Sequence, residues 1–373
     1  MKVSEVEALL ALRLLPGIGD LGATRLLRGA GSARRAWSDP DAVARAGRSE
    51  TRRALARPES WVIRARSILR RCEGAGIAVV GFLDDAYPET LRHLHDPPPI
   101  LFMKGRTKVL SRPLVAMVGS RKATATGRRT ARRMARELSS RGMGVVSGMA
   151  LGIDGAAHRG ALEGKGSTVA VLGRGPDRAY PVANADLFRA VGRDGLLLSE
   201  FPPGERARPH NFPRRNRIIA ALAWGVVVVE AGERSGALIT VDHALDLGRE
   251  VMAVPGSVEW EQSRGTHALI RSLGCIVTSS RDILERVPWA SLGMPEGGEG
   301  MGELDPAPRL RLEGPTESME ERLDELVGIE PLPLEEILAR SGLPASRALS
   351  TLTRLEIEGR LRREPEGWVR VEC

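Results

Sequence analysis

The spacing of apolar side chains divides the chain into segments of different kinds. In the first 75 residues, apolar positions recur at helical spacing, as in 6–15, 24–27 and 61–69, and no stretch alternates like a strand. From about residue 76 to residue 287, short apolar runs rich in β-formers alternate with helical patterns, which predicts parallel strands joined by crossover helices. The predicted strands are 114–118, 144–147, 168–172, 196–199, 226–230, 251–254 and 275–278.

The C-terminal part of the chain has a different pattern. Gly, Pro and Glu dominate residues 289–316, which predicts a flexible linker. Helical stretches follow at 323–327, 334–341 and 346–359, and 361–371 fits a hairpin that turns at 365–367, an order that indicates a winged helix. We therefore expect a helical domain over 1–75, a Rossmann-like α/β domain with a parallel or mixed sheet over 76–288, the linker, and a winged-helix domain over 317–373.

Charge and cysteine content narrow the class of protein. The chain carries 55 basic and 47 acidic side chains, a formal charge of +8, and only five of the basic residues are lysines. This arginine bias fits either a GC-rich genome or a polyanionic partner, because guanidinium groups form bidentate contacts with phosphates. Cys72, Cys275 and Cys373 lack metal-site spacing, so we expect a reducing compartment and no metal. With no leader pattern and no apolar run of membrane-spanning length, we expect a cytoplasmic protein without membrane contact.

Glycine-containing turns follow several of the predicted strands. The strand at 114–118 stops at Gly119 and leads into an Arg-rich helical segment, and such a turn presents free backbone amides to an anion. Gly119 allows a close approach, Ser120 offers a hydroxyl and Arg121 offers a fork for phosphate oxygens. An ordinary strand-to-helix turn is the alternative.

Two further turns have the same character. Gly148 follows the strand at 144–147, while Ser235 and Gly236 follow the strand at 226–230. Ser235 is either a helix N-cap or a ligand contact. Because the carboxyl ends of parallel strands lie on one edge of a sheet, the turns together predict a single anion-binding groove.

A proline-rich loop leads into an arginine-rich segment at 201–217, and we expect helix from Arg214 onward. Arginines beside an aromatic ring suit single-stranded nucleic acid, because the charges follow the backbone and a base stacks on the ring. For Phe212, a place in the core is the alternative. The arginines fall in the first helical turn, where cations are unfavourable unless an anion binds. The candidate residues here are Arg208, Phe212, Arg214, Arg215, Asn216 and Arg217.

The turn at 115–121 lacks the motifs of nucleotide-dependent enzymes. Neither a Gly-x-Gly-x-x-Gly fingerprint nor a Gly-Lys-Ser/Thr run occurs there, which argues against NAD binding and ATP hydrolysis. Asp154 and His158 lie one helical turn apart and could form an acid-base pair, but one carboxylate and one imidazole make no catalytic set. We expect them to be a helix-stabilising pair or to hold the shape of the turn. We therefore expect a non-catalytic protein without a cofactor. The enzyme alternative is a lysine-decarboxylase-like nucleotide phosphoribohydrolase, whose Pro-Gly-Gly-x-Gly-Thr-x-x-Glu run has no good copy here.

The segments 115–127, 147–162, 180–184, 198–221 and 228–256 together resemble the DprA family (DNA-processing protein A, also called Smf) over most of residues 76–287. The resemblance implies an extended Rossmann fold, a homodimer, binding of single-stranded DNA, and loading of the recombinase RecA during natural transformation. In the family pattern, residues 119–121 form a phosphate loop, and 208–217 with its phenylalanine lines the DNA groove.

Two positions depart from this family pattern. Leu151 stands where family members usually have arginine, and His267 stands where they usually have asparagine. The pattern places a base contact near His267, which joins the expected DNA-binding set. That set is Gly119, Ser120, Arg121, Gly148, Arg208, Phe212, Arg214, Arg215, Asn216, Arg217, Ser235, Gly236 and His267.

The two end modules leave more than one role open. The run 14–19 resembles a helix-hairpin-helix (SAM-like) element, whose Gly-x-Gly hairpin offers amides to a DNA phosphate, and residues 1–75 carry fifteen basic against eight acidic side chains. DNA contact and protein contact are both open for it. Residues 317–373 have a net charge of −5, which repels phosphate, so we expect the winged helix to contact protein or to regulate. A local basic patch at Arg360, Arg362 and Arg363 and a sequence-specific repressor are the alternatives.

Overall fold

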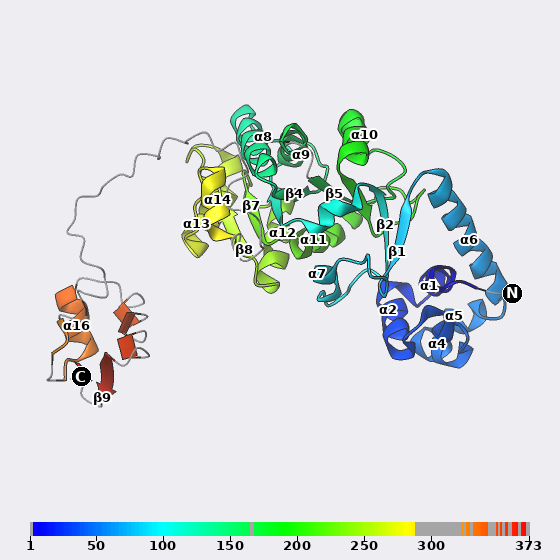
Figure 1. Ribbon diagram of the computed structural model, residues 1–373, viewed down its shortest axis with the longest axis horizontal. Helices are drawn as coiled ribbons and strands as arrows, with labels where there is room; N and C mark the ends of the chain where they lie inside the picture. The colour runs from blue at the N-terminus through cyan, green and yellow to red at the C-terminus, as the bar shows by residue number, and fades with distance from the viewer. Residues whose placement is uncertain are drawn as a thin grey trace. The chain divides into compact units, whose positions relative to one another are not determined.

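The computed structural model describes residues 3–164 and 168–287 and parts of the segment 323–370. The chain forms two compact units, Met1–Gly300 and Met301–Cys373. The first unit begins with a group of short helices, drawn in blue in Figure 1. They are α1 (Glu5–Leu14), α2 (Gly19–Ala30), α3 (Ala33–Trp37), α4 (Pro40–Ala46), α5 (Ser49–Ala54) and α6 (Pro58–Gly74).

Local capping explains where these helices begin. The Ser4 hydroxyl accepts a hydrogen bond from the Glu7 amide, and the Glu7 carboxylate accepts one from the Ser4 amide, so a capping box opens α1. Pro58 is the first residue of α6, a position where the backbone N–H has no partner within the helix, so proline costs no hydrogen bond there. Leu10 of α1 and Leu27 of α2 are buried in one cluster with Val62 of α6. The three predicted N-terminal helical stretches coincide with α1, α2 and α6.

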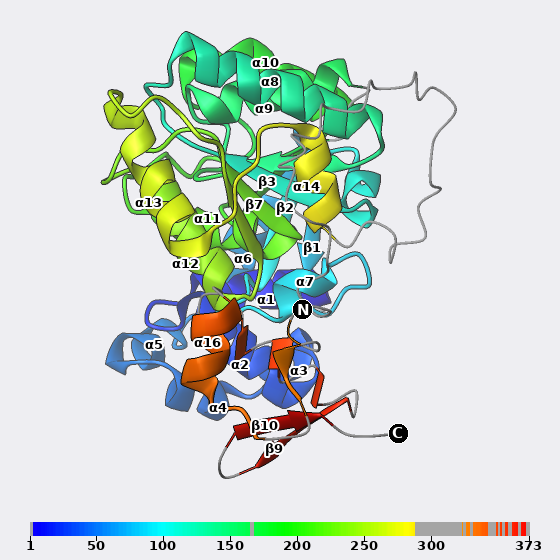
Figure 2. The same ribbon diagram turned by 90° about the vertical axis from the view of Figure 1, so that its left-hand side faces the viewer.

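Eight strands form one sheet in the order β1-β2-β6-β5-β4-β3-β7-β8. Strands β1, β2, β3 and β7 of this sheet are labelled in Figure 2. Strands β3 to β8 are parallel, and β1 and β2 extend one edge as antiparallel strands. The chain runs from β3 outward to β6 and then returns to place β7 on the other side of β3, so the topological switch point lies between β3 and β7. The strands are β1 (Ala78–Gly81), β2 (Ile100–Gly105), β3 (Leu114–Val118), β4 (Gly144–Ser147), β5 (Thr168–Leu172), β6 (Leu196–Ser199), β7 (Gly225–Val228) and β8 (Glu250–Ala253).

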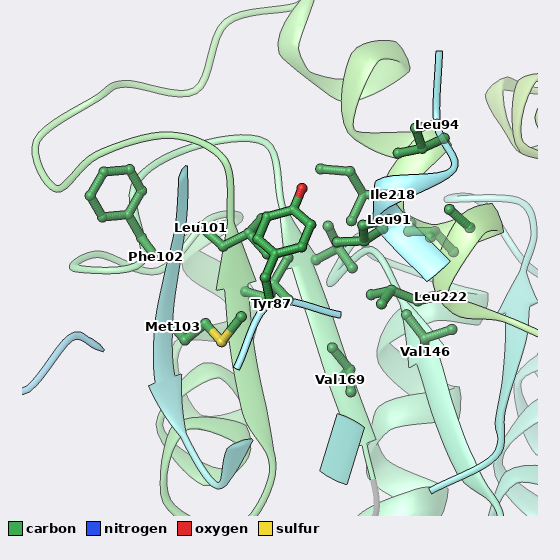
Figure 3. Packing of buried hydrophobic residues seen from close by; sticks show 14 of the residues in the cluster. Tyr87, Leu91, Leu94, Leu101, Phe102, Met103, Val146, Val169, Ile218 and Leu222 are labelled. Carbon is green, nitrogen blue, oxygen red and sulfur yellow. The ribbon is translucent and has the colours of Figure 1, made fainter. Parts of the chain in front are cut away.

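Alternating side chains of the strands pack against two helical layers. Val115 and Met117 of β3 belong to a buried cluster with α8, α9 and α14, whereas Ala116 and Val118 belong to a second cluster with α11 and α12. Figure 3 shows part of the second cluster, in which Ile218 of α11 lies beside Leu91 of α7. The helices are α7 (Glu89–Arg92), α8 (Ala125–Ser140), α9 (Ile153–Glu163), α10 (Ala185–Asp194), α11 (Asn211–Leu222), α12 (Gly236–Asp246), α13 (Arg264–Leu273) and α14 (Ser280–Arg286).

The predicted strands at 114–118, 144–147, 168–172 and 196–199 are confirmed, and β7 and β8 begin one residue earlier than predicted. The predicted strand at 275–278 is wrong. Only Ile276 bridges to Ala253, because the amide and hydroxyl of Thr278 donate to Asp282 and the chain turns into α14. Strands β1 and β2 were not predicted, and their antiparallel pairing makes the sheet mixed. The Rossmann-like α/β fold class is confirmed.

The second unit contains helix α16 (Leu334–Ser341) and the antiparallel strands β9 (Leu361–Glu364) and β10 (Gly367–Arg370). The helix at 334–341 and the hairpin were both predicted. Leu332 pairs with Trp368, which belongs to a small buried apolar cluster with Ile337 and Leu361, and Leu332 packs against this cluster. The predicted linker at 289–316, and most of the predicted helix at 346–359, lie outside the described residues.

Candidate nucleic-acid interface

A cavity of about 340 Å³ lies at the carboxyl ends of β3 and β7, where the strand order reverses. This is the edge on which open parallel sheets place their ligands. The cavity is lined by residues from the end of β3, the turn before α9 and the start of α9, the first three turns of α11, and the start of α12. Seven members of the predicted DNA-binding set are among them: Gly119, Arg121, Phe212, Arg215, Asn216, Ser235 and Gly236.

The turn after β3 differs from the sequence prediction in how its amides are used. The Ser120 amide donates to the Glu230 carbonyl at 2.7 Å, and the Lys122 amide donates to the Ser120 hydroxyl at 3.1 Å. The Thr124 amide donates to the Glu230 carboxylate at 2.9 Å, so a side-chain anion already lies at the start of α8. The prediction of a turn with free amides is therefore wrong for these three groups. The exposed side chains of Arg121 and Lys122 supply the charge of this turn instead, and Arg121 lines the cavity.

Gly119 is required by packing. A Cβ atom at this position would lie 2.6 Å from Ile153 and 2.7 Å from the Glu230 carbonyl oxygen. Both neighbours are fixed, because one is a buried side chain of α9 and the other is backbone, so no larger residue fits without a shift of α9 or β7. The glycine brings these elements together and thereby shapes one wall of the cavity.

Phe212 lies at the edge of the cavity and is partly buried. Its ring stacks on Tyr180, with the centroids 5.5 Å apart and the planes at 27°. The Arg121 guanidinium carbon lies 5.4 Å from the Phe212 centroid. The sequence left two roles open for this ring, base stacking and a place in the core. The ring packs against the protein and still borders the cavity, so it has features of both. Tyr180 was not predicted as a site residue; the only signal was its place in the short segment 180–184 that resembles the family.

Arg215 lies beneath the cavity and is buried. Its guanidinium donates to the carbonyl oxygens of Gly148, at 2.6 Å, and of Val171. Burial lowers the pKa of Arg215 to about 10, although the nearby Asp154 opposes this shift. A Cβ atom at Gly148 would lie 2.4 Å from the Arg215 guanidinium. Gly148 is thus a glycine because of Arg215, and not because a ligand approaches it, as the sequence suggested.

Arg214 and Arg217 point away from the cavity, contrary to prediction. The helix begins at Asn211, three residues earlier than predicted, and Arg214 and Arg217 share the face opposite the cavity. Both contact the buried Glu200 carboxylate at 2.9 Å. Their charge is therefore balanced inside the protein, and no external anion is needed there.

The same acidic contacts join α11 to the N-terminal helices. Arg214 also pairs with Asp20 of α2, and Asp20 pairs with Arg13 of α1 at 2.5 Å. Burial alone would raise the pKa of Asp20, but Arg13 and Arg214 more than offset it, and the pKa lies below its usual range.

The remaining predicted residues lie outside the cavity lining. Arg208 is exposed and pairs with Glu205 at 3.3 Å. His267, near the start of α13, has its Nε2 3.0 Å from the Gly256 carbonyl oxygen. At the hairpin 14–19, a Cβ atom at Gly17 would lie 2.8 Å from the Thr51 hydroxyl of α5, while Gly17 and Gly19 are both exposed. The structure does not bring these residues to the cavity.

Asp154 and His158 do not bond to each other. The Asp154 carboxylate accepts from the amides of Gly148, at 3.2 Å, and Ala150, at 3.4 Å. His158 Nε2 accepts from the Met149 amide at 3.3 Å, and its Nδ1 lies 2.7 Å from the Thr168 hydroxyl. Both side chains therefore hold the turn after β4, which is the shape-holding role, and the alternative of a helix-stabilising pair is wrong.

The burial of His158 gives a testable pH dependence. Burial, followed by the charge of Arg215, lowers the pKa of His158 from 6.5 to about 3. The unfolded chain then binds a proton that the folded chain excludes, so stability is complete above pH 6.5 and falls as the pH drops toward 3. We expect this residue to contribute a slope of about 1.4 kcal/mol per pH unit in urea unfolding measured across that range. His158→Gln should flatten the profile by that amount, and parallel profiles would contradict the assignment.

Two general findings concern the described part of the chain. No group of three or more His, Cys, Asp or Glu side chains among those residues is placed to hold a metal ion. No helix in the same residues is long and apolar enough to cross a membrane.

Comparison with known proteins gives two family matches. Residues 78–288 match the family of DNA recombination-mediator protein A, and residues 306–367 match the DprA winged helix domain. The second match confirms that the C-terminal region contains the predicted winged helix.

Curated relatives and solved structures agree with these matches. The DNA processing protein DprA of Streptococcus pneumoniae is 46% identical over 202 residues, 54% of this chain and 71% of the relative. Protein Smf of Escherichia coli is 37% identical over 286 residues, 76% of this chain and 75% of the relative.

The crystal structure of DNA processing protein A from S. pneumoniae matches with a TM-score of 0.67 at 35% identity, over 77% of this chain and 99% of that one. A structure of the Helicobacter pylori protein, which describes its single-stranded DNA binding mode, matches with a TM-score of 0.51 at 27% identity, over 56% and 94%. The chain therefore belongs to the DprA/Smf family of DNA processing proteins, the family of DNA recombination-mediator protein A.

Proposed function

We propose that this protein binds single-stranded DNA in the cavity at the switch point and acts by holding the strand, without catalysis. The observation that carries the proposal is the meeting of Arg121, Phe212 and Arg215 in one cavity at the ligand-binding edge of the sheet. The single-stranded DNA binding described for the H. pylori relative supports it.

The chemistry of the cavity suits a flexible polyanion. Arg121 is exposed and offers a bidentate contact to a phosphate. Phe212 offers a ring on which any base can stack, which favours binding without sequence preference. The buried guanidinium of Arg215 adds positive potential from below, where low polarity strengthens it. Because Arg214 and Arg217 are balanced by acidic groups, we assign them to the support of α11 rather than to DNA.

The wider role follows from family membership. We propose that the protein works in the cytoplasm as a homodimer, protects incoming DNA, and loads RecA recombinase during natural transformation and DNA processing. The proposed domains are a helical domain at 1–75, the DNA-binding domain at 76–288, a linker at 289–316 and the winged helix at 317–373. The winged helix contacts protein, in keeping with its acidic charge.

Arg121→Ala is the direct test. We expect the variant to bind a mixed-sequence oligonucleotide about ten- to a hundredfold more weakly in dilute buffer, because a charge-assisted phosphate contact is lost. The slope of log affinity against log salt should fall by about one counterion. Fluorescence anisotropy across a salt series measures both quantities.

Arg281→Ala is the matched control, since Arg281 is an exposed arginine of α14 paired with Glu285. It should bind like the wild type. Failure of the wild-type protein to bind oligonucleotides in dilute buffer would refute the proposal. Release of free base from nucleoside monophosphates would favour the phosphoribohydrolase instead.

A further inference from the structure

The loop that carries Tyr180 is fixed at both ends. At its start, the Asp177 carboxylate accepts a hydrogen bond from the Gly204 amide at 3.0 Å. At its end, the side-chain amide of Asn184 donates to the backbone carbonyl oxygens of Met149 and Ala150, at 3.0 and 3.1 Å. Ala150 lines the cavity, so the loop is anchored directly to the cavity wall.

Within this fixed loop, Tyr180 is exposed although it is aromatic. Its relative exposure is 45%, whereas Phe212, on which it stacks, borders the cavity. A ring that served only to fill space against Phe212 would gain by burying more of its surface. An exposed ring on an anchored loop instead presents a preorganised surface at low entropic cost.

We propose that Tyr180 is a second stacking platform, which takes the DNA base next to the one held at the cavity. The inference rests on the proposed function and extends it, because it gives the strand a path from the cavity outward over the loop at 177–184. Successive bases of a single strand stack on successive aromatic rings in this way. The contact is to a base and not to a phosphate, so its contribution does not depend on salt.

Tyr180 can be modified selectively, because the chain has only two tyrosines. Of the two tyrosines in the sequence, Tyr87 is buried, and its hydroxyl donates to the Pro98 carbonyl oxygen at 2.8 Å. Burial also raises the pKa of Tyr87. Reagents that need an exposed phenol therefore report on Tyr180.

The first experiment is nitration of the full-length protein by tetranitromethane, with and without a saturating thymidine oligonucleotide. We expect DNA to slow the nitration of Tyr180 at least severalfold, as read by mass spectrometry. Photo-cross-linking with 5-iodouracil placed at each position of the strand should give one strong cross-link to Tyr180. An unchanged nitration rate under saturating DNA would overturn the proposal.

The second experiment separates a base contact from mere support of Phe212. Tyr180→Leu should weaken binding of an octanucleotide about tenfold with an unchanged salt slope, while Tyr180→Phe should bind like the wild type. Binding of a mononucleotide, which occupies the cavity alone, should be unaffected by Tyr180→Leu. An equal loss of affinity for the octanucleotide and the mononucleotide would overturn the proposal, because it would show that Tyr180 only supports the position of Phe212.

Val182→Ala is the matched control, because Val182 lies on the same loop and is 79% exposed but carries no ring. It should leave both affinities unchanged. If the wild-type protein bound no DNA, the proposed function and this inference would both fail. Normal binding with an unprotected Tyr180 would refute this inference alone.

Discussion

Glu200→Ala lowers the expected free energy of unfolding of the first unit by about 3 kcal/mol. Glu200 is fully buried at the end of β6 and balances two guanidinium groups, those of Arg214 and Arg217. Removing one partner of a buried ion pair leaves the other charge uncompensated, which costs about 3–5 kcal/mol. We expect the lower end of this range, because Arg217 keeps its ion pair with Asp96 at 2.9 Å and is therefore not left without a partner. Urea unfolding followed by circular dichroism measures the loss.

A double replacement provides the control for this prediction. Glu200→Met combined with Arg217→Met should cost much less than Glu200→Ala, because a buried pair exchanged for apolar side chains is often close to neutral. One carboxylate oxygen of Glu200 and one guanidinium nitrogen of Arg217 have no hydrogen-bond partner in the described structure, so the pair is not an optimal one. Arg214→Gln should cost less than about 1 kcal/mol, because the Arg214 side chain is 39% exposed. Equal losses for all three variants would contradict the assignment.

Gly148→Ala is expected to destabilise the same unit by about 2–5 kcal/mol. The added methyl group would lie 2.4 Å from the Arg215 guanidinium, which hydrogen bonds hold to the carbonyls of Gly148 and Val171. Overpacking costs about 1–3 kcal/mol, and displacing a buried charged donor from its acceptors adds a comparable amount. The variant should also bind DNA more weakly, since Arg215 forms part of the cavity. Thermal unfolding and anisotropy titration measure the two effects.

Gly236→Ala is the matched control for this substitution. Gly236 lines the same cavity, yet a Cβ atom there meets nothing within 4 Å. As the first residue of α12, it should accept alanine with little change in stability. A similar loss in both glycine variants would show that packing against Arg215 is not the cause.

The parts of the fold with a strong local pattern were predictable from the sequence. The central strands β3 to β6 are short apolar runs between glycines and helical segments, and burial on both faces leaves this pattern intact. The edge strands β1 and β2 were missed because a four-residue run such as Ala78–Gly81 gives almost no periodicity. The run at 275–278 was wrongly predicted because the capping box of Ser279 and Asp282 starts α14 there, and Asp282 also accepts from Thr278.

The position of the cavity was predictable from the sequence, but the contacts of the arginines around it were not. Glycine turns at strand ends correctly located the cavity, because topology alone fixes that edge. Adjacent arginines in α11 looked equivalent, yet Arg215 lies under the cavity, and Arg214 faces the N-terminal helices. Their acidic partners Asp20 and Glu200 are distant in sequence, so no local pattern reveals the pairing.

The two-sided environment of α11 also limits how the length of this segment can vary. Each residue advances a helix by about 100°, so one inserted residue before Arg214 would carry Arg214 and Arg217 toward the cavity and Asn216 toward the acidic groups. The lining of the cavity and the ion pairs with Glu200 would both be disrupted. Homologues that differ in length here should therefore place every gap in the proline-rich stretch at 202–210, where the described backbone is mostly irregular and exposed. An alignment with a gap inside 211–222 would have to carry compensating changes on both sides of the helix.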